Sequence, residues 1–269
     1  MMPNQTKIPL IARRQKNIYT AFFIIITVLF ILTSLYTNFN IFVLLKNSDA
    51  FWHFISRDFF PPALPKTSAV GEILSNILIT LALAMSSTTI AAILAFFMSL
   101  FASEKISPLP RFAKYIRGIA TFLRNIPALV WAFILFSSLG IGTSVGFIAL
   151  CITSFAFMVR AFTETIEDVS SDCVESLQSV GAGFWQRVFQ AVLPTCLSGF
   201  LSWFLYCIEV NIRASTIVGM VGGGGIGLTL FSYIKGFQYD VAFSIILLIA
   251  VMVIIVDQIT NKLRREILK

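Results

Sequence analysis

The stretch TETIEDVSSDCVESLQSVGAGFWQRVFQAVLP, residues 163–194, is a polar and partly acidic insertion between long apolar runs. Its pattern predicts a helix from about Ser171, a break from Gly181 to Gly183 and a second short helix before Pro194. Two short helices at an angle would protrude from a bilayer, whereas the alternative is a solvated connector with an amphipathic helix on the bilayer surface. One face of the second helix is predicted to carry Trp185, Val188, Phe189 and Val192.

The composition of the whole chain is that of an integral membrane protein. Hydrophobic residues make up 57% of the 269 residues, charged residues only 12%, and phenylalanine occurs 27 times, which is far from the balance of a soluble domain. The net charge of +7 comes from short basic clusters beside apolar runs, where such clusters orient a protein in a membrane. We therefore expect an all-α protein in contact with lipid and no nucleic-acid partner.

Uncharged runs predict about six transmembrane helices, since a helix needs roughly 20 apolar residues to cross the hydrocarbon layer. Residues 17–45 are predicted to be a retained span, because the run is too long for a signal peptide and lacks a clear cleavage site. The uncharged stretch 125–159 is predicted to be a hairpin of two spans broken at 137–144. The other predicted spans are 73–103, 196–218 and 241–259.

The basic clusters flank the predicted spans on one side, which the positive-inside rule assigns to the cytoplasm. We therefore expect a cytoplasmic N-terminus at 1–16, a single transmembrane domain at 17–260 and a cytoplasmic C-terminus at 261–269. The polar loop, at 163–195, would lie on the same side. Residues 51–65, FWHFISRDFFPPALP, are predicted to form an interfacial loop or short helix on the opposite surface. The clusters are Lys7, Arg13, Arg14 and Lys16; Lys105, Arg111, Lys114 and Arg117; and Lys262, Arg264, Arg265 and Lys269.

A second unusual stretch, EVNIRASTIVGMVGGGGIG at 209–227, places charges inside an apolar run. Glu209 and Arg213 have the i, i+4 spacing and the order that favour an ion pair. Arg213 lies nineteen residues after Pro194, or about 28 Å along a helix, which predicts a position near the outer membrane edge. The pair either neutralises itself, with Arg213 snorkelling to the interface, or lines a translocation pathway. The pathway interpretation would involve Glu209, Asn211, Arg213, Ser215 and Thr216.

The glycines of this stretch also have two interpretations. They permit close helix packing or a tight turn, or they form an irregular segment at the outer mouth whose backbone N–H groups face an anion. Because Arg213, Ser215 and Thr216 can all donate hydrogen bonds to an oxyanion, their position before the glycines favours an anionic cargo. The glycines are Gly222, Gly223, Gly224, Gly225 and Gly227.

Most catalytic chemistries find little support in the sequence. His53 is the single histidine, and the four cysteines lack metal-site spacing, so we expect structural thiols and no metal site. The chain has no G-x-x-x-x-G-K-[ST] phosphate loop, so it is not expected to bind a cofactor or hydrolyse ATP itself. The enzyme alternative is an intramembrane hydrolase that uses Ser215 or a cysteine with Glu209 as the base. An ion channel or a passive scaffold is a further alternative.

The polar loop resembles the EAA loop of permeases from binding-protein-dependent ABC transporters. Glu175, Gly181, Leu193 and Pro194 match its register, although Ser176 and Leu177 replace the two alanines and Ala191 replaces the isoleucine. The resemblance implies a coupling helix that docks on a separate cytoplasmic ATPase, so that two ATPase subunits, which use ATP and Mg, supply the energy by hydrolysing ATP. The loop residues implied in docking are Glu175, Ser176, Leu177, Gly181, Ala182, Leu193 and Pro194.

The segments NIRASTIVGMVGGGGIGLTL (211–230), IKGFQYD (234–240) and FFPP (59–62) look like the permease of phosphonate ABC importers. The resemblance implies a type I importer permease with a methionine-importer-like fold in the bacterial inner membrane. It further implies a second permease copy or paralogue, an external solute-binding protein, and alternating-access import of a phosphonate or related oxyanion. Phosphite, phosphate and an amino acid such as methionine are the alternative cargoes.

Overall fold

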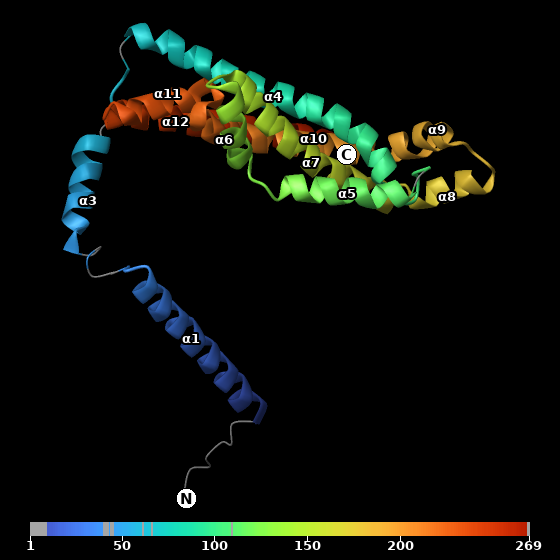
Figure 1. Ribbon diagram of the computed structural model, residues 1–269, viewed down its shortest axis with the longest axis horizontal. Coiled ribbons are helices and arrows are strands. Elements are labelled where there is room, and N and C mark those ends of the chain that lie inside the picture. Colours follow the sequence, from blue (N-terminus) through green and yellow to red (C-terminus); the bar gives the residue numbers. More distant parts are fainter. Residues whose placement is uncertain are drawn as a thin grey trace, which may run out of the picture. The chain divides into compact units, whose positions relative to one another are not determined.

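The computed structural model describes residues 10–267 except 40–42, 44–45, 61, 66 and 109. The outermost parts of the expected cytoplasmic termini, 1–9 and 268–269, lie outside the described residues, as do the end of the expected first span and Pro61 of the FFPP segment. The chain divides into two compact units, Met1–Asp58 and Phe59–Lys269 (Figure 1).

The first unit consists mainly of helix α1 (Leu10–Tyr36), followed by α3 (Ser48–Phe54) and the π-helical segment η1 (Ile55–Phe59). Within α1, Gln15–Tyr36 is long and apolar enough to cross a membrane. Its apolar side chains are exposed all around the helix, as expected for a span that faces lipid. The short helix expected within 51–65 is present as the end of α3 and η1.

The second unit contains the remaining helices, in an all-helical bundle (Figure 1). Its order is α4 (Thr67–Ala102), α5 (Pro110–Arg124), α6 (Ala128–Leu139), α7 (Thr143–Val169), α8 (Ser171–Ser179), α9 (Phe184–Arg187), η2 (Val188–Val192), α10 (Leu193–Val218), η3 (Gly219–Gly223), α11 (Gly225–Lys235) and α12 (Tyr239–Ile267).

Among the described residues, five helices are long and apolar enough to span a membrane, or six if one bent pair counts as a span. The expectation of about six spans is therefore confirmed. The predicted two-span hairpin at 125–159 is wrong in its first half, because α6 has only 12 residues, about 18 Å of helix. Instead, Arg111–Arg124 and Ala128–Leu139 form a pair bent by 85°. Pro127 lies at the bend, where it lacks an N–H and disfavours helical conformation in the preceding residue.

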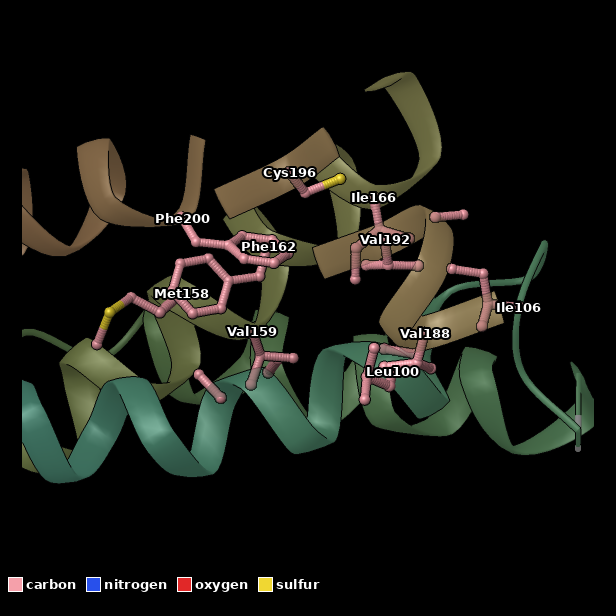
Figure 2. Packing of buried hydrophobic residues seen from close by; sticks show 14 of the residues in the cluster. Leu100, Ile106, Met158, Val159, Phe162, Ile166, Val188, Val192, Cys196 and Phe200 are labelled. Atoms are coloured by element: carbon pink, nitrogen blue, oxygen red, sulfur yellow. The ribbon is translucent and has the colours of Figure 1, made fainter. Parts of the chain in front are cut away.

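The core is formed by α4, α7 and α10, which pack against one another, while α5 and α6 pack on α7 and α12 packs on α10. The largest buried cluster lies where α4, α7 and α10 approach the α8–α9 turn (Figure 2). It includes Leu100 of α4, Phe162 of α7 and Phe200 of α10. The rings of Phe162 and Phe200 are 4.7 Å apart, a separation at which aromatic pairs stabilise each other beyond their burial.

Candidate functional site

The α8–α9 segment, residues 171–187, has the predicted helix, break and second helix. The N–H of Gly181 donates to the carbonyl of Gln178, and that of Ala182 donates to the carbonyl of Leu177, both at 3.0 Å. This pair of bonds is a Schellman motif, which places Gly181 at φ +81°. A residue with a side chain pays about 1–2 kcal/mol for that conformation. The turn therefore requires a glycine at position 181.

One side of α8 packs against the bundle, and the other side is exposed. Val174 is buried and Leu177 is half-buried against the main cluster, whereas Glu175 and Ser176 are exposed. After the break, the Phe184 ring stacks on Phe101 of α4, with centroids 5.9 Å apart. The α8–α9 segment thus presents a carboxylate on a firmly attached helix.

The predicted single apolar face of the second helix is wrong. Trp185 and Phe189 stack on each other and are 54% and 63% exposed, whereas Val188 and Val192 are buried in the main cluster. The helix passes after four residues into the wider turn of η2 and then runs on into α10. A wider turn rotates successive residues by a smaller angle, so the valines and the aromatic residues separate onto different sides.

Glu167, near the end of α7, connects the base of the α8–α9 segment to α5. Its carboxylate forms an ion pair with Arg117 and accepts the backbone N–H of Glu104 at 2.9 Å. Arg117 also donates from Nε to the carbonyl of Ala102 at 2.7 Å, and Lys105 donates to the Glu167 carbonyl at 3.0 Å. Sequence reasoning missed this cluster, because no local pattern relates residues 50 and 63 positions apart.

Glu209 and Arg213 form the ion pair that their spacing predicts. The carboxylate is the more enclosed partner, since the Glu209 side chain is 13% exposed and that of Arg213 is 51% exposed. A second arginine, Arg264 of α12, lies with Nη2 3.9 Å from Glu209 Oε2. One carboxylate therefore serves two guanidinium groups from different helices.

The contact with Arg264 brings together two residues that were expected on opposite sides of the membrane. Arg213 is expected near the outer edge and Arg264 in the cytoplasmic cluster, yet both flank Glu209, so only one of the two expected depths can hold. The continuous helical segment Phe184–Gly223 has 40 residues, or about 60 Å of helix, which is twice the hydrocarbon thickness.

Asn211 joins three helices through a buried polar cluster. Its Nδ2 donates to Thr88 Oγ1 of α4 at 2.7 Å and to Ser154 Oγ of α7 at 2.6 Å, and all three residues are buried. Ser215 and Thr216, the other hydroxyls expected on a pathway, are buried as well, and Thr216 donates to the carbonyl of Ile212 of its own helix. Both residues are thus enclosed by neighbouring helices in the described chain, and their place on a pathway stays a prediction.

The glycine segment is buried throughout residues 222–227. The backbone has φ +101° at Gly222, +80° at Gly224 and +67° at Gly225, conformations that glycine adopts without steric cost. These angles produce the tight turn between η3 and α11. The segment is thus buried in the described chain, and its location at the outer mouth stays a prediction.

Neighbouring backbones approach this segment too closely for side chains. A Cβ atom on Gly227 would overlap the carbonyl oxygen of Thr216, and one on Gly146 of α7 would lie 2.6 Å from the carbonyl oxygen of Gly223. The N–H of Ile226 donates to Thr80 Oγ1 of α4 at 2.9 Å. These contacts support the close-packing interpretation of the glycines.

A cavity of about 320 Å³ lies beside Asn211, where α5 breaks into α6 and faces α7 and α10. Its lining includes Arg124, Ser154, Tyr206 and Asn211. Arg124 directly precedes the uncharged stretch 125–159, and sequence reasoning gave it no role. The sequence did offer one signal for this residue. Arg124 is a cation directly before the Asn125-Ile126-Pro127 break, and the last side chains of a helix that ends at such a break are exposed.

The chain matches known transport proteins over most of its length. Residues 91–269 match the family described as the binding-protein-dependent transport system inner membrane component. The phosphate-import permease protein PhnE of Mycolicibacterium smegmatis is 32% identical over 218 residues, which are 80% of this chain and 41% of that protein. The chain thus spans less than half the length of this relative. The phosphite transport system permease protein PtxC of Stutzerimonas stutzeri is 34% identical over 187 residues, 70% of this chain and 68% of that protein.

Solved structures show the same fold. The MetNI methionine ABC transporter in an inward-facing conformation superposes with a TM-score of 0.67 at 17% identity, over 76% of this chain and 99% of the other. The expected methionine-importer-like permease fold is therefore confirmed. Because the family match covers well over half of the 269 residues, the chain belongs to the binding-protein-dependent transport system inner membrane component family, the multi-pass permease subunits of ABC importers.

Proposed function

We propose that this protein is the permease subunit of an importer that carries a phosphonate or a related phosphorus oxyanion across the bacterial inner membrane by alternating access. The observation that carries the proposal is the family match together with relatives named for phosphate, phosphite and phosphonate transport. The relative named for phosphonate transport is the cryptic phosphonate transport system permease protein PhnE2 of Escherichia coli, which is 34% identical over 119 residues. Permeases named for carnitine and glycine betaine transport are less similar, at 22–24% identity.

The α8–α9 segment supports coupling to a separate ATPase. It presents Glu175 on an attached helix and contains the Gly181 turn at the position of the EAA register. Closure of two ATPase subunits, which bind ATP and Mg, would push on this segment and move α7 and α10. Leu193 and Pro194 begin α10, so the loop residues and a core helix are one continuous element.

The pathway is completed by partners. A second permease copy or a close paralogue would enclose the pathway, and an external solute-binding protein would deliver the cargo. Both termini are proposed to be cytoplasmic, since the basic clusters flank the same ends of the spans. Phosphite and phosphate are the alternative cargoes within the same oxyanion chemistry, and methionine is the alternative outside it.

The test is ATP-dependent uptake of radiolabelled methylphosphonate into proteoliposomes that contain this chain with its ATPase and binding-protein partners. Phosphate, phosphite and methionine serve as competitors. We expect uptake that phosphorus oxyanions block and methionine does not. Uptake of methionine, or no uptake of any phosphorus compound, would overturn the cargo assignment.

A further inference from the structure

The cavity beside Asn211 is suited to an anion by its charge. Of the residues that line it, Arg124 is the only ionisable one with a full charge at neutral pH, and no aspartate or glutamate is among them. Arg117, Arg160 and Arg213 each pair with a carboxylate. The Arg124 side chain forms no ion pair or hydrogen bond with any residue in the described part of the chain. Its guanidinium group is therefore available to a ligand.

A second donor comes from the Asn211 cluster. The Thr88 hydroxyl donates to the carbonyl of Ala84 at 2.6 Å, so its oxygen can only accept from Asn211 Nδ2, which fixes the orientation of the amide. The same nitrogen donates to Ser154 Oγ. Ser154, whose oxygen is thus an acceptor, has no acceptor of its own within the described residues and retains its hydrogen for a group in the cavity.

The remaining wall is apolar. Phe157, Val210 and Ala214 line the cavity together with the Tyr206 side chain, and the rings of Phe157 and Tyr206 are 5.7 Å apart. The volume of about 320 Å³ falls at the lower end of the range for small-molecule sites. The cavity therefore combines one cation and a hydroxyl donor with a surface for a nonpolar substituent.

We infer that this cavity is a cargo subsite, in which Arg124 and Ser154 bind the oxygens of a tetrahedral phosphorus oxyanion. Arg124 forms a charge-assisted, two-point contact with two oxygens, because the guanidinium fork matches their spacing. Ser154 donates to a third oxygen, and the apolar wall receives the hydrogen or carbon substituent of a phosphite or phosphonate. This inference rests on the proposed function and identifies the site at which the permease distinguishes its cargo.

The site also has a place in the transport machinery. Arg124 is seven residues after Arg117 on α5, so the two side chains project from the same side of the helix, two turns apart. Arg117 is bound to Glu167 next to the α8–α9 segment. These contacts would carry a movement of that segment along α5 to the cation in the cavity.

The experiment measures methylphosphonate uptake as a function of concentration for the complete complex in proteoliposomes, together with ATP hydrolysis stimulated by the binding protein. Arg124→Gln is expected to lower uptake at subsaturating cargo by about tenfold, and Ser154→Ala by a smaller factor, since the arginine supplies a full positive charge and two bonds whereas the serine supplies one bond from a neutral donor. Arg124→Lys should restore part of the activity, because a lysine keeps the charge but not the two-point geometry. Arg111→Gln, at the other end of α5, is the matched control and should transport normally.

The outcomes separate the two proposals. If the wild-type complex transports no phosphorus oxyanion, the proposed function fails. If it does and Arg124→Gln and Ser154→Ala both match Arg111→Gln, the subsite is refuted while the function stands. If Arg124→Gln does not assemble, uptake by Arg124→Lys and Ser154→Ala is compared with uptake by Arg111→Gln instead. Equal uptake by all three variants would refute the subsite.

A phospholipid headgroup carries the same phosphate chemistry as the free oxyanion. A second set of assays distinguishes the two occupants. The uptake assays are repeated in vesicles of phosphatidylcholine alone and in vesicles that also contain phosphatidylglycerol. An equal effect of Arg124→Gln in both supports the free oxyanion as the occupant. An effect that disappears without the anionic lipid would overturn the inference and assign Arg124 to the headgroup.

Discussion

Arg117 of α5 holds the carboxylate of Glu167, so the end of α7 that leads into the α8–α9 segment is bound to the helix that carries Arg124. The contact joins parts of the chain that are 50 residues apart. Both side chains are partly exposed, so the pair contributes little to overall stability. We infer that the Arg117–Glu167 pair couples α5 to the α8–α9 segment rather than stabilising the fold.

Arg117→Gln should therefore lower cargo uptake per ATP hydrolysed several-fold, while the free energy of unfolding changes by less than about 1 kcal/mol. The measurement is parallel uptake and ATP hydrolysis in proteoliposomes. Arg160→Gln is the matched control, because it breaks the exposed Arg160–Glu164 pair on α7. Equal uptake per ATP in both variants would contradict a coupling role for Arg117.

Glu175→Lys should abolish uptake and leave the protein in the membrane, because Glu175 is exposed on α8 and no partner within the described chain depends on it. Gly181→Pro should have the same effect, since proline cannot adopt the positive φ of the Schellman turn. Co-purification of the ATPase subunit reports docking directly. Cys173→Lys, at another exposed position of α8, is the control, and normal ATPase binding by Glu175→Lys would refute the docking role.

Gly227→Ala should destabilise the protein by about 1–3 kcal/mol or prevent assembly, because the added methyl group would overlap the carbonyl of Thr216 in a packed core. Gly118→Ala on α5 meets nothing within 4 Å and should stabilise the helix by up to about 1 kcal/mol. Thermal unfolding of the two variants in the same detergent gives the comparison. Equal midpoints would show that the glycine segment can relax and is not closely packed.

Glu209→Gln should destabilise the protein more than Arg213→Gln. Removing the carboxylate leaves Arg213 and Arg264 without their shared partner, at a cost of about 1–3 kcal/mol, whereas the half-exposed Arg213 reaches solvent. Thermal unfolding tests the order, and the reverse order would contradict the shared-carboxylate arrangement. Uptake by Arg213→Gln then separates the two interpretations of the pair: normal uptake supports neutralisation, and lost uptake with unchanged stability supports a pathway role.

Local patterns predicted the parts of this protein that depend on neighbouring residues. The length of the apolar runs predicted the long spans, and the Gly181 break predicted the turn between α8 and α9. The i, i+4 spacing predicted the Glu209–Arg213 pair. Each of these features is set within a few helical turns, where the 3.6-residue period relates sequence to position directly.

The tertiary structure decided the features that involve helices distant in sequence. These include the contact of Arg264 with Glu209 and the packing that buried the glycine segment. They also include the 85° bend between α5 and α6 and the placement of Arg124, Asn211 and Ser154 around one cavity. The sequence by itself determined that the chain crosses a membrane and which segment protrudes. The cavity depended on the relative placement of α5, α7 and α10. A helical period specifies which face of a helix is apolar, but it does not specify which other helix will cover that face.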